Sequence, residues 1–242
     1  MDNIDDIYMT MDCHHRMHIA HKGFWRNGEK QMPGPFTAIS HEDVKEKKWK
    51  PVQEQYQEHA EWYTSMLEKG GRFTLMVWPE HCLVGTTGNA IVQPINEAVQ
   101  EWALKSKKTV TYIQKAQHCL TEMYSVFKAE VPLPNVPSTD LNESLLSDLC
   151  RSGRYAKVVV CGQASSHCVA FSCKDLVEHW PNYAGSRPLS DIILLEDGCS
   201  PVSGFEQAAQ DFFQEMRLKG VTLAKCQDAK LKPSKQQSYG KK

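Results

Sequence analysis

The cysteine at position 168 stands where a predicted buried strand gives way to a helix. The apolar run Val158-Val159-Val160-Cys161 is typical of a strand, and Gly162 and small residues follow it. A helix with one apolar side starts near Cys168, which places this thiol in the first turn. The dipole and unpaired N–H groups of a helix start favour thiolate over thiol and can receive an oxyanion. Cys168 is therefore a candidate nucleophile, although an isolated cysteine more often only packs.

A carboxylate and several imidazoles form a second candidate site. Asp12 and His14 are two residues apart at a predicted strand end, so they project to one side. His18 follows His14 by four residues, and His81 follows a different strand. Mixed carboxylate and imidazole ligands suit Zn²⁺, Fe²⁺ or Mn²⁺, but a histidine-rich run can equally be a solvated loop. The neighbouring histidines of this run are predicted to be such loop residues: His15 and His21.

A lysine follows another strand. The predicted strand at 109–113 leads to Lys115, and Tyr124-Ser125-Val126-Phe127 comes nine residues later. A lysine beside a cysteine favours the charged thiolate. Most lysines at strand ends are plain surface charges, so the position alone leaves both interpretations open.

The order of elements indicates how these groups are positioned. Further strands are predicted at 4–11, 73–77, 157–161, 191–195 and 221–225, and helices at 56–67, 95–105, 141–149, 166–178 and 205–218. Ser40 with Asp43 has the spacing of a capping box and predicts a short helix. Strands that alternate with helices predict an α/β fold with a parallel sheet covered on both faces. Such sheets bind ligands at the carboxyl ends of their strands, where the candidate residues lie.

Composition excludes several classes of function. The chain has 28 Lys and Arg against 29 Asp and Glu, so no basic excess indicates nucleic acid as a partner. Its apolar runs are too short to cross a membrane, and its start lacks the pattern of a signal peptide. Nine cysteines without a regular framework indicate free thiols in a reducing compartment, and we expect a cytoplasmic protein.

The nucleophile segment resembles that of the isochorismatase-like cysteine hydrolases. The stretch 160–175 has their order of Gly, a small residue, polar residues and then Cys followed by Val. The resemblance implies a three-layer α/β/α sandwich with a mostly parallel, Rossmann-like sheet. It also implies a cis peptide between Gln163 and Ala164, which turns the backbone amides of Ala164 and Cys168 toward an oxyanion. One position departs from the usual pattern, because Ser166 stands where most members have Asp.

The histidine segments resemble the nicotinamidase branch of this family. The pattern Asp-x-His-x-x-x-His, followed by Trp-Pro-x-His-Cys, is similar to its two metal-binding segments. The resemblance implies one divalent metal ion, with zinc first and iron or manganese as alternatives. The implied ligands are Asp12, His14 and His81, and the ring nitrogen of the substrate completes the shell. The implied substrate-binding residues are Trp78, which stacks on a pyridine ring, Tyr124 and His18.

The third family segment is similar to the stretch that starts at Lys115, which implies that Lys115 is the catalytic lysine. The glycine that usually follows this lysine is Ala116 here. The family's general-base Asp lies on a strand that precedes the metal segment. Only eleven residues precede Asp12, so we expect that strand and its Asp to be missing from this sequence.

These features predict a hydrolase of linear amides, a nicotinamidase of pyridine nucleotide salvage. Cys168 would attack nicotinamide through a thioester, giving nicotinate and ammonia. The alternatives are a member that binds metal or ligand without efficient turnover, and a related amidase with another substrate. We expect one hydrolase domain over residues 1–228, incomplete at its N-terminal side, with 22–72 as a lid or a contact in a homo-oligomer, and a disordered tail over 229–242.

Overall fold

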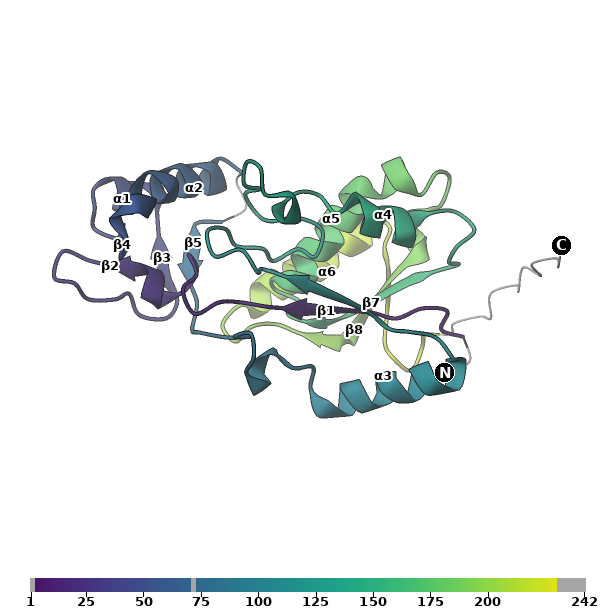
Figure 1. Ribbon diagram of the computed structural model, residues 1–242. Coiled ribbons are helices and arrows are strands. Elements are labelled where there is room, and N and C mark those ends of the chain that lie inside the picture. The colour runs from purple at the N-terminus through teal and green to yellow at the C-terminus, as the bar shows by residue number, and fades with distance from the viewer. Residues whose placement is uncertain (1–2, 71–72, 230–242) are drawn as a thin grey trace. The chain divides into compact units, whose positions relative to one another are not determined.

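The computed structural model describes residues 3–70 and 73–229 (Figure 1). The chain divides into two compact units, and both termini belong to the first. The first unit comprises 1–9, 93–112 and 142–242, and the second comprises 10–92 and 113–141. Nearly all of the predicted tail, 230–242, lies outside the described residues. Among those described, no helix is long and apolar enough to cross a membrane.

The first unit is built on a parallel three-stranded sheet. Its order is β7 (Val158–Gln163), β8 (Ile192–Ser200) and β9 (Thr222–Ala224). The register of β7 and β8 shifts between Val160 and Gly162, and the extra residues lie on β8. The helices of this unit are α3 (Gln93–Ser106), α4 (Glu143–Cys150), α5 (Cys168–Tyr183) and α6 (Glu206–Leu218). Helices α5 and α6 contribute a buried apolar side to its core: Val169, Cys173, Leu176, Trp180, Phe212 and Met216. The apolar strands therefore find the helical cover that a parallel sheet requires.

The second unit contains short elements, only some of which the sequence patterns predicted. Strand β2 (Trp25–Arg26) pairs antiparallel with β4 (Lys50–Pro51), and β3 (Thr37–Ile39) pairs antiparallel with β5 (Leu75–Val77). Its helices are α1 (His41–Lys45) and α2 (Gln57–Lys69), and α2 buries Ala60, Tyr63, Thr64 and Leu67. Of these elements, α1, α2 and β5 were predicted, and β2, β3 and β4 were not. Strands as short as β2, β3 and β4 carry too little alternation to be read from sequence, whereas the helical period of α2 is long enough.

Strands β1 (Tyr8–Asp12) and β6 (Thr111–Lys115) pair with each other, and the division between the units passes through both. Each strand ends at a candidate site residue, Asp12 or Lys115. This pair therefore places the carboxylate and the ammonium group at neighbouring strand ends.

The predicted capping box at α1 is confirmed. Ser40 Oγ accepts a hydrogen bond from Asp43 N–H at 3.1 Å, and Asp43 Oδ2 accepts one from Ser40 N–H at 3.0 Å. Lys48 Nζ donates to Asp43 Oδ1 at 2.8 Å. Burial alone would raise the pKa of Asp43, but these hydrogen bonds from Lys48 and Ser40 lower it below its ordinary value.

Replacing this carboxylate should destabilise the protein in a pH-dependent way. Asp43→Ala is expected to lower the free energy of unfolding by about 1 kcal/mol at neutral pH, because the capping box is lost. A lowered pKa means that the stabilisation is present above the ordinary pKa of Asp and is lost as the pH falls through the native pKa. Urea unfolding at neutral and acidic pH measures both effects. Glu42→Ala is the control, since Glu42 has only an exposed pair with Lys45; an equal loss in both variants would contradict the prediction.

Candidate active site and metal centre

Cys168 is the first residue of α5, as the sequence predicts. Strand β7 runs to Gln163, and the Gln163–Ala164 peptide bond is cis, which confirms the expected geometry of this turn. The Ala164 carbonyl accepts hydrogen bonds from His167 N–H and Val169 N–H at 3.0 and 3.1 Å. These two hydrogen bonds join the turn to the first residues of α5. The Cys168 thiol is half-buried at this helix start, whose first N–H groups have no partner within the helix.

Ser166 is buried in the same turn and replaces a carboxylate with a hydroxyl. Its Oγ accepts a hydrogen bond from Val202 N–H at 3.0 Å and lies 2.9 Å from His167 Nδ1. Ser165 N–H donates to the Ser200 carbonyl at 2.9 Å. Ser165 and Ser166 thus fasten the nucleophile turn to the segment that follows β8. A neutral hydroxyl is sufficient for this role, because its main partner is a backbone N–H.

Four imidazole rings gather in the second unit. Ring centroids lie 4.6 Å apart for His14 and His18, 4.6 Å for His14 and His81, and 5.0 Å for His14 and His21. His14, His18 and His21 are at most 1% exposed. The expectation that His21 is a solvated loop residue is therefore wrong, whereas His15 is exposed as predicted. His21 is held inside because Trp78 forms a strand-like bridge with it.

The carboxylate of Asp12 faces this histidine cluster. Its Oδ2 atom lies 3.6 Å from His14 Nδ1 and 3.6 Å from His81 Nε2. Both distances are too long for a hydrogen bond. They suit two atoms bound to one ion, since tetrahedral zinc ligands about 2.1 Å from the metal lie about 3.4 Å from each other. Asp12 therefore lies close to both of the other predicted ligands, His14 and His81.

Lys115 holds the other oxygen of Asp12. Its Nζ donates to Asp12 Oδ1 at 2.8 Å and to the Met123 carbonyl at 2.9 Å, and its side chain is 5% exposed. Burial alone would raise the pKa of Asp12, but the charge of Lys115, with His81 and His14, holds it well below its ordinary value. Lys115 is therefore no surface charge, and it keeps Asp12 ionised with Oδ2 turned toward the histidines.

The hydrogen bonds of the rings decide which nitrogen can bind a metal. His81 Nδ1 lies 2.8 Å from the Pro79 carbonyl, and His21 Nδ1 lies 3.1 Å from the His15 carbonyl. A carbonyl only accepts, so Nδ1 of each ring carries a hydrogen, and Nε2 is the nitrogen that a metal would take. Burial, and then the charges of His14 and His81, lower the pKa of His21 to about 4, which leaves it neutral. Burial alone would lower the pKa of His81, but Asp12 raises it above its ordinary value, so a metal at this ring would displace a proton.

Glu122 sets the state of His14 and was missed from the sequence. Its Oε1 lies 3.3 Å from His14 Nε2 and accepts from Met123 N–H at 2.9 Å. Burial alone would raise the pKa of Glu122, but His14 and then His18 lower it to about 2, so it is ionised. His14 Nε2 therefore donates to Glu122, and Nδ1 is the nitrogen that faces Asp12. A metal-binding histidine commonly has such a carboxylate behind it.

His18 differs from the other three rings. Its Nδ1 accepts a hydrogen bond from Ala20 N–H at 3.1 Å, and burial lowers its pKa to about 3. A neutral ring whose Nδ1 accepts must carry its hydrogen on Nε2, so this nitrogen has no lone pair to give. Atoms of His14, His18 and Glu122 also come within 4.8 Å of one another, as do atoms of His14, His21 and His81. The tautomers favour the second trio as metal ligands.

Removing the charge behind His14 should weaken metal binding without removing a ligand. Glu122→Gln keeps a side-chain oxygen for Met123 N–H but no longer provides a carboxylate for His14 Nε2–H. We expect the dissociation constant for zinc to rise by about 10- to 100-fold, the usual effect of losing such a partner. Competition with a fluorescent zinc chelator measures it. Glu130→Gln is a nearby control, and the same affinity in Glu122→Gln as in the unmodified protein would contradict the assignment.

The predicted substrate-binding aromatics contact each other. Trp78 Nε1 donates to Tyr124 Oη at 2.7 Å, and the two side chains are 7% and 6% exposed. Phe36 meets the Trp78 ring edge-on at 5.8 Å. All three belong to the second unit, as do Lys115 and the histidine cluster, whereas Cys168 belongs to the first.

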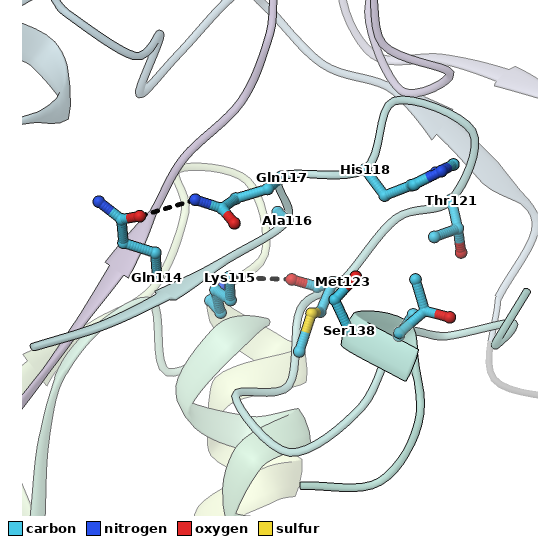
Figure 2. Close-up of a pocket in the computed structure, with 10 residues that line it drawn as sticks. Gln114, Lys115, Ala116, Gln117, His118, Thr121, Met123 and Ser138 are labelled. Atoms are coloured by element: carbon cyan, nitrogen blue, oxygen red, sulfur yellow. Dashed lines mark hydrogen bonds between the residues drawn. The ribbon is translucent and has the colours of Figure 1, made fainter. Parts of the chain in front are cut away.

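A small cavity opens beside Lys115 (Figure 2). Its volume is about 40 Å³, and it is lined by residues of 114–139 that include Gln117, His118 and Thr121. Ligand pockets are typically about 300 Å³ or larger, so this cavity has room for water only. Ala116 at its wall has φ 60°, so the chain keeps the left-handed turn usual for glycine.

Comparisons with known proteins were made in sequence and in fold. No protein-family model matches the chain. Over 146 residues it is 25% identical to a nicotinamidase of Escherichia coli (strain K12), a match that covers 60% of this chain and 56% of that protein. The chain thus spans little more than half the length of this curated relative.

The solved structures with a similar fold include nicotinamidases. A nicotinamidase/pyrazinamidase of Acinetobacter baumanii has a TM-score of 0.54 at 18% identity, over 92% of this chain and 78% of that one. The yeast nicotinamidase Pnc1p bound to the inhibitor nicotinaldehyde has a TM-score of 0.55 at 15% identity, over 91% and 79%. The predicted α/β fold is confirmed by this likeness. In sequence and in fold, the chain is therefore similar to nicotinamidases.

Proposed function

We propose that the protein hydrolyses nicotinamide to nicotinate and ammonia with Cys168 as the nucleophile and one zinc ion. The observation that carries the proposal is that Asp12 Oδ2 lies 3.6 Å from both His14 Nδ1 and His81 Nε2. It is supported by the helix start at Cys168 and by the similarity to nicotinamidases. The free thiols and the proposed role in pyridine nucleotide salvage fit a cytoplasmic enzyme.

The proposed metal ligands are Asp12 Oδ2, His14 Nδ1, His21 Nε2 and His81 Nε2. Three buried ring nitrogens of the histidine cluster have no hydrogen-bond partner among the described residues: His14 Nδ1, His18 Nε2 and His21 Nε2. Such atoms are costly unless an ion or water meets them, and the tautomers assign the ion to His14 and His21. Three imidazoles and one carboxylate suit zinc, and also Fe²⁺ or Mn²⁺. When bound, the ion would act as a Lewis acid that orients the ring nitrogen of the substrate.

Side chains and backbone groups of the protein would carry out the other chemical steps. The Cys168 thiolate attacks the carboxamide carbon, and backbone N–H groups at Ala164 and Cys168 receive the developing oxyanion. The amide nitrogen takes up the proton that the thiol released and leaves as ammonia, which leaves a thioester on Cys168. Water then hydrolyses the thioester to nicotinate and restores the thiol. Lys115 stays charged and keeps Asp12 in place, while Trp78 and Tyr124 provide an apolar wall for the ring.

Two amides that differ in one ring atom test the proposal. Nicotinamide and benzamide are incubated with the zinc-loaded protein, and ammonia and the carboxylic acid are measured. We expect nicotinamide to be hydrolysed and benzamide to react at least about 10-fold more slowly, because benzamide lacks the ring nitrogen. Equal rates would refute the role of the metal in orienting the ring. No acid from either amide would refute the proposed substrate.

A further inference from the structure

Four of the nine free cysteines lie on or beside the sheet of the first unit. Cys161 is on β7, Cys199 is on β8, Cys226 follows β9 and Cys173 is on α5. Gly198 precedes Cys199 in β8, at the place where the pairing of β7 with β8 shifts register.

Cys161 and Cys226 both lie close to Gly198. A Cβ built on Gly198 would lie 3.1 Å from Cys161 Cβ and 3.4 Å from Cys226 Sγ. Cys161 Cβ and Cys226 Sγ are therefore no farther apart than the sum of these two distances. Because Gly198 has no side chain, none of its own side-chain atoms lies between them. Both cysteines are exposed, so a small oxidant can reach them.

The turn that carries Cys226 is held against β8. Cys226 N–H donates to Asp197 Oδ1 at 2.7 Å, and residues 226–228 form a turn after β9. A disulfide keeps its two Cβ atoms about 3.8 Å apart, so a local shift of an exposed turn is enough to form one. Cys173 on α5 is 2% exposed, so an oxidant reaches it less easily than the two exposed cysteines. Burial raises the pKa of Cys161, and the hydrogen bond with Asp197 raises that of Cys226, so exposure and proximity distinguish this pair.

We propose that Cys161 and Cys226 form a reversible disulfide across Gly198 when the protein meets a low-molecular-weight disulfide such as glutathione disulfide. One protein thiolate attacks glutathione disulfide, forms a mixed disulfide and releases one glutathione. The second protein thiolate then displaces the second glutathione, so that two protein thiols are oxidised and one glutathione disulfide is reduced to two glutathione molecules. The bond fastens the turn after β9 to the strand that leads to the nucleophile turn.

Peptide mapping tests this pair directly. The full chain is treated with glutathione disulfide in mildly alkaline buffer, alkylated with N-ethylmaleimide and digested with trypsin without reduction. The expected product joins the peptide 158–174 to the peptide 226–230. Because 158–174 also contains Cys168 and Cys173, fragmentation must place the bond at Cys161. Dithiothreitol should remove the product.

Variants give the matched comparison. Cys161→Ser and Cys226→Ser should lose the joined peptide and carry glutathione on the remaining partner. Cys168→Ser and Cys199→Ser should keep the joined peptide at the level of the unmodified protein. Only glutathione adducts in the unmodified protein, or a bond from Cys226 to Cys168, Cys173 or Cys199, would overturn the proposal. None of these readouts depends on amidase activity.

Discussion

Cys168→Ala is expected to abolish nicotinamide hydrolysis while leaving the fold and the metal content unchanged. In the proposed mechanism, the thiol is the only group that attacks the carboxamide carbon. Loss of a nucleophile typically lowers kcat by roughly 10⁴-fold or more. Cys168 is half-buried at the first position of α5, where alanine fits the helix. Release of nicotinate, followed by chromatography, measures the effect.

A neighbouring cysteine provides the control for this experiment. Cys173→Ala lies on the same helix but is buried against the sheet side of α5. It should retain the turnover rate of the unmodified protein per folded molecule, even where its thermal stability falls. Comparable activity in Cys168→Ala and the unmodified protein would eliminate the cysteine mechanism. Equal losses in both cysteine variants would show that packing, and not nucleophilic chemistry, is being measured.

The parts of the site that the sequence predicted are those encoded by local spacing. Asp12 and His14 lie two residues apart at a strand end, and Cys168 lies between a strand and a helix, so neighbouring residues alone indicate their placement. The helix α2 was predicted in the same way, because its buried residues recur at a helical period. The capping box of α1 is also local, since it needs only Ser40 and Asp43.

The parts that were missed depend on contacts between distant segments. Glu122 meets His14 across 108 residues of sequence, and nothing in its own neighbourhood distinguishes it from a surface acid except the apolar and aromatic residues that follow it. His21 looks like a loop residue until the chain at Trp78 covers it. The domain limits stay a prediction, as does the role of 22–72 as a lid or an oligomer contact.

Single substitutions in the histidine cluster should separate ligands from neighbours. His21→Ala is expected to weaken zinc binding by about 100-fold. The binding free energy of a typical structural zinc site is about 10–16 kcal/mol, so each of four ligands contributes about 3 kcal/mol, which corresponds to this factor. His81→Ala should have an effect of similar size. The measurement is a zinc titration of the purified apoprotein against a competing chelator, with circular dichroism to confirm folding.

His18→Ala makes the same test discriminating. His18 is as deeply buried as His21 and lies as close to His14, so a general loss of packing would affect both variants alike. The hydrogen bond from Ala20 N–H leaves its Nε2 protonated, so we expect zinc affinity to fall far less than in His21→Ala. His15→Ala, an exposed change, should leave the affinity unaltered. A larger loss in His18→Ala than in His21→Ala would reverse the assignment and place the ion between His14, His18 and Glu122, because those are the atoms of the other trio.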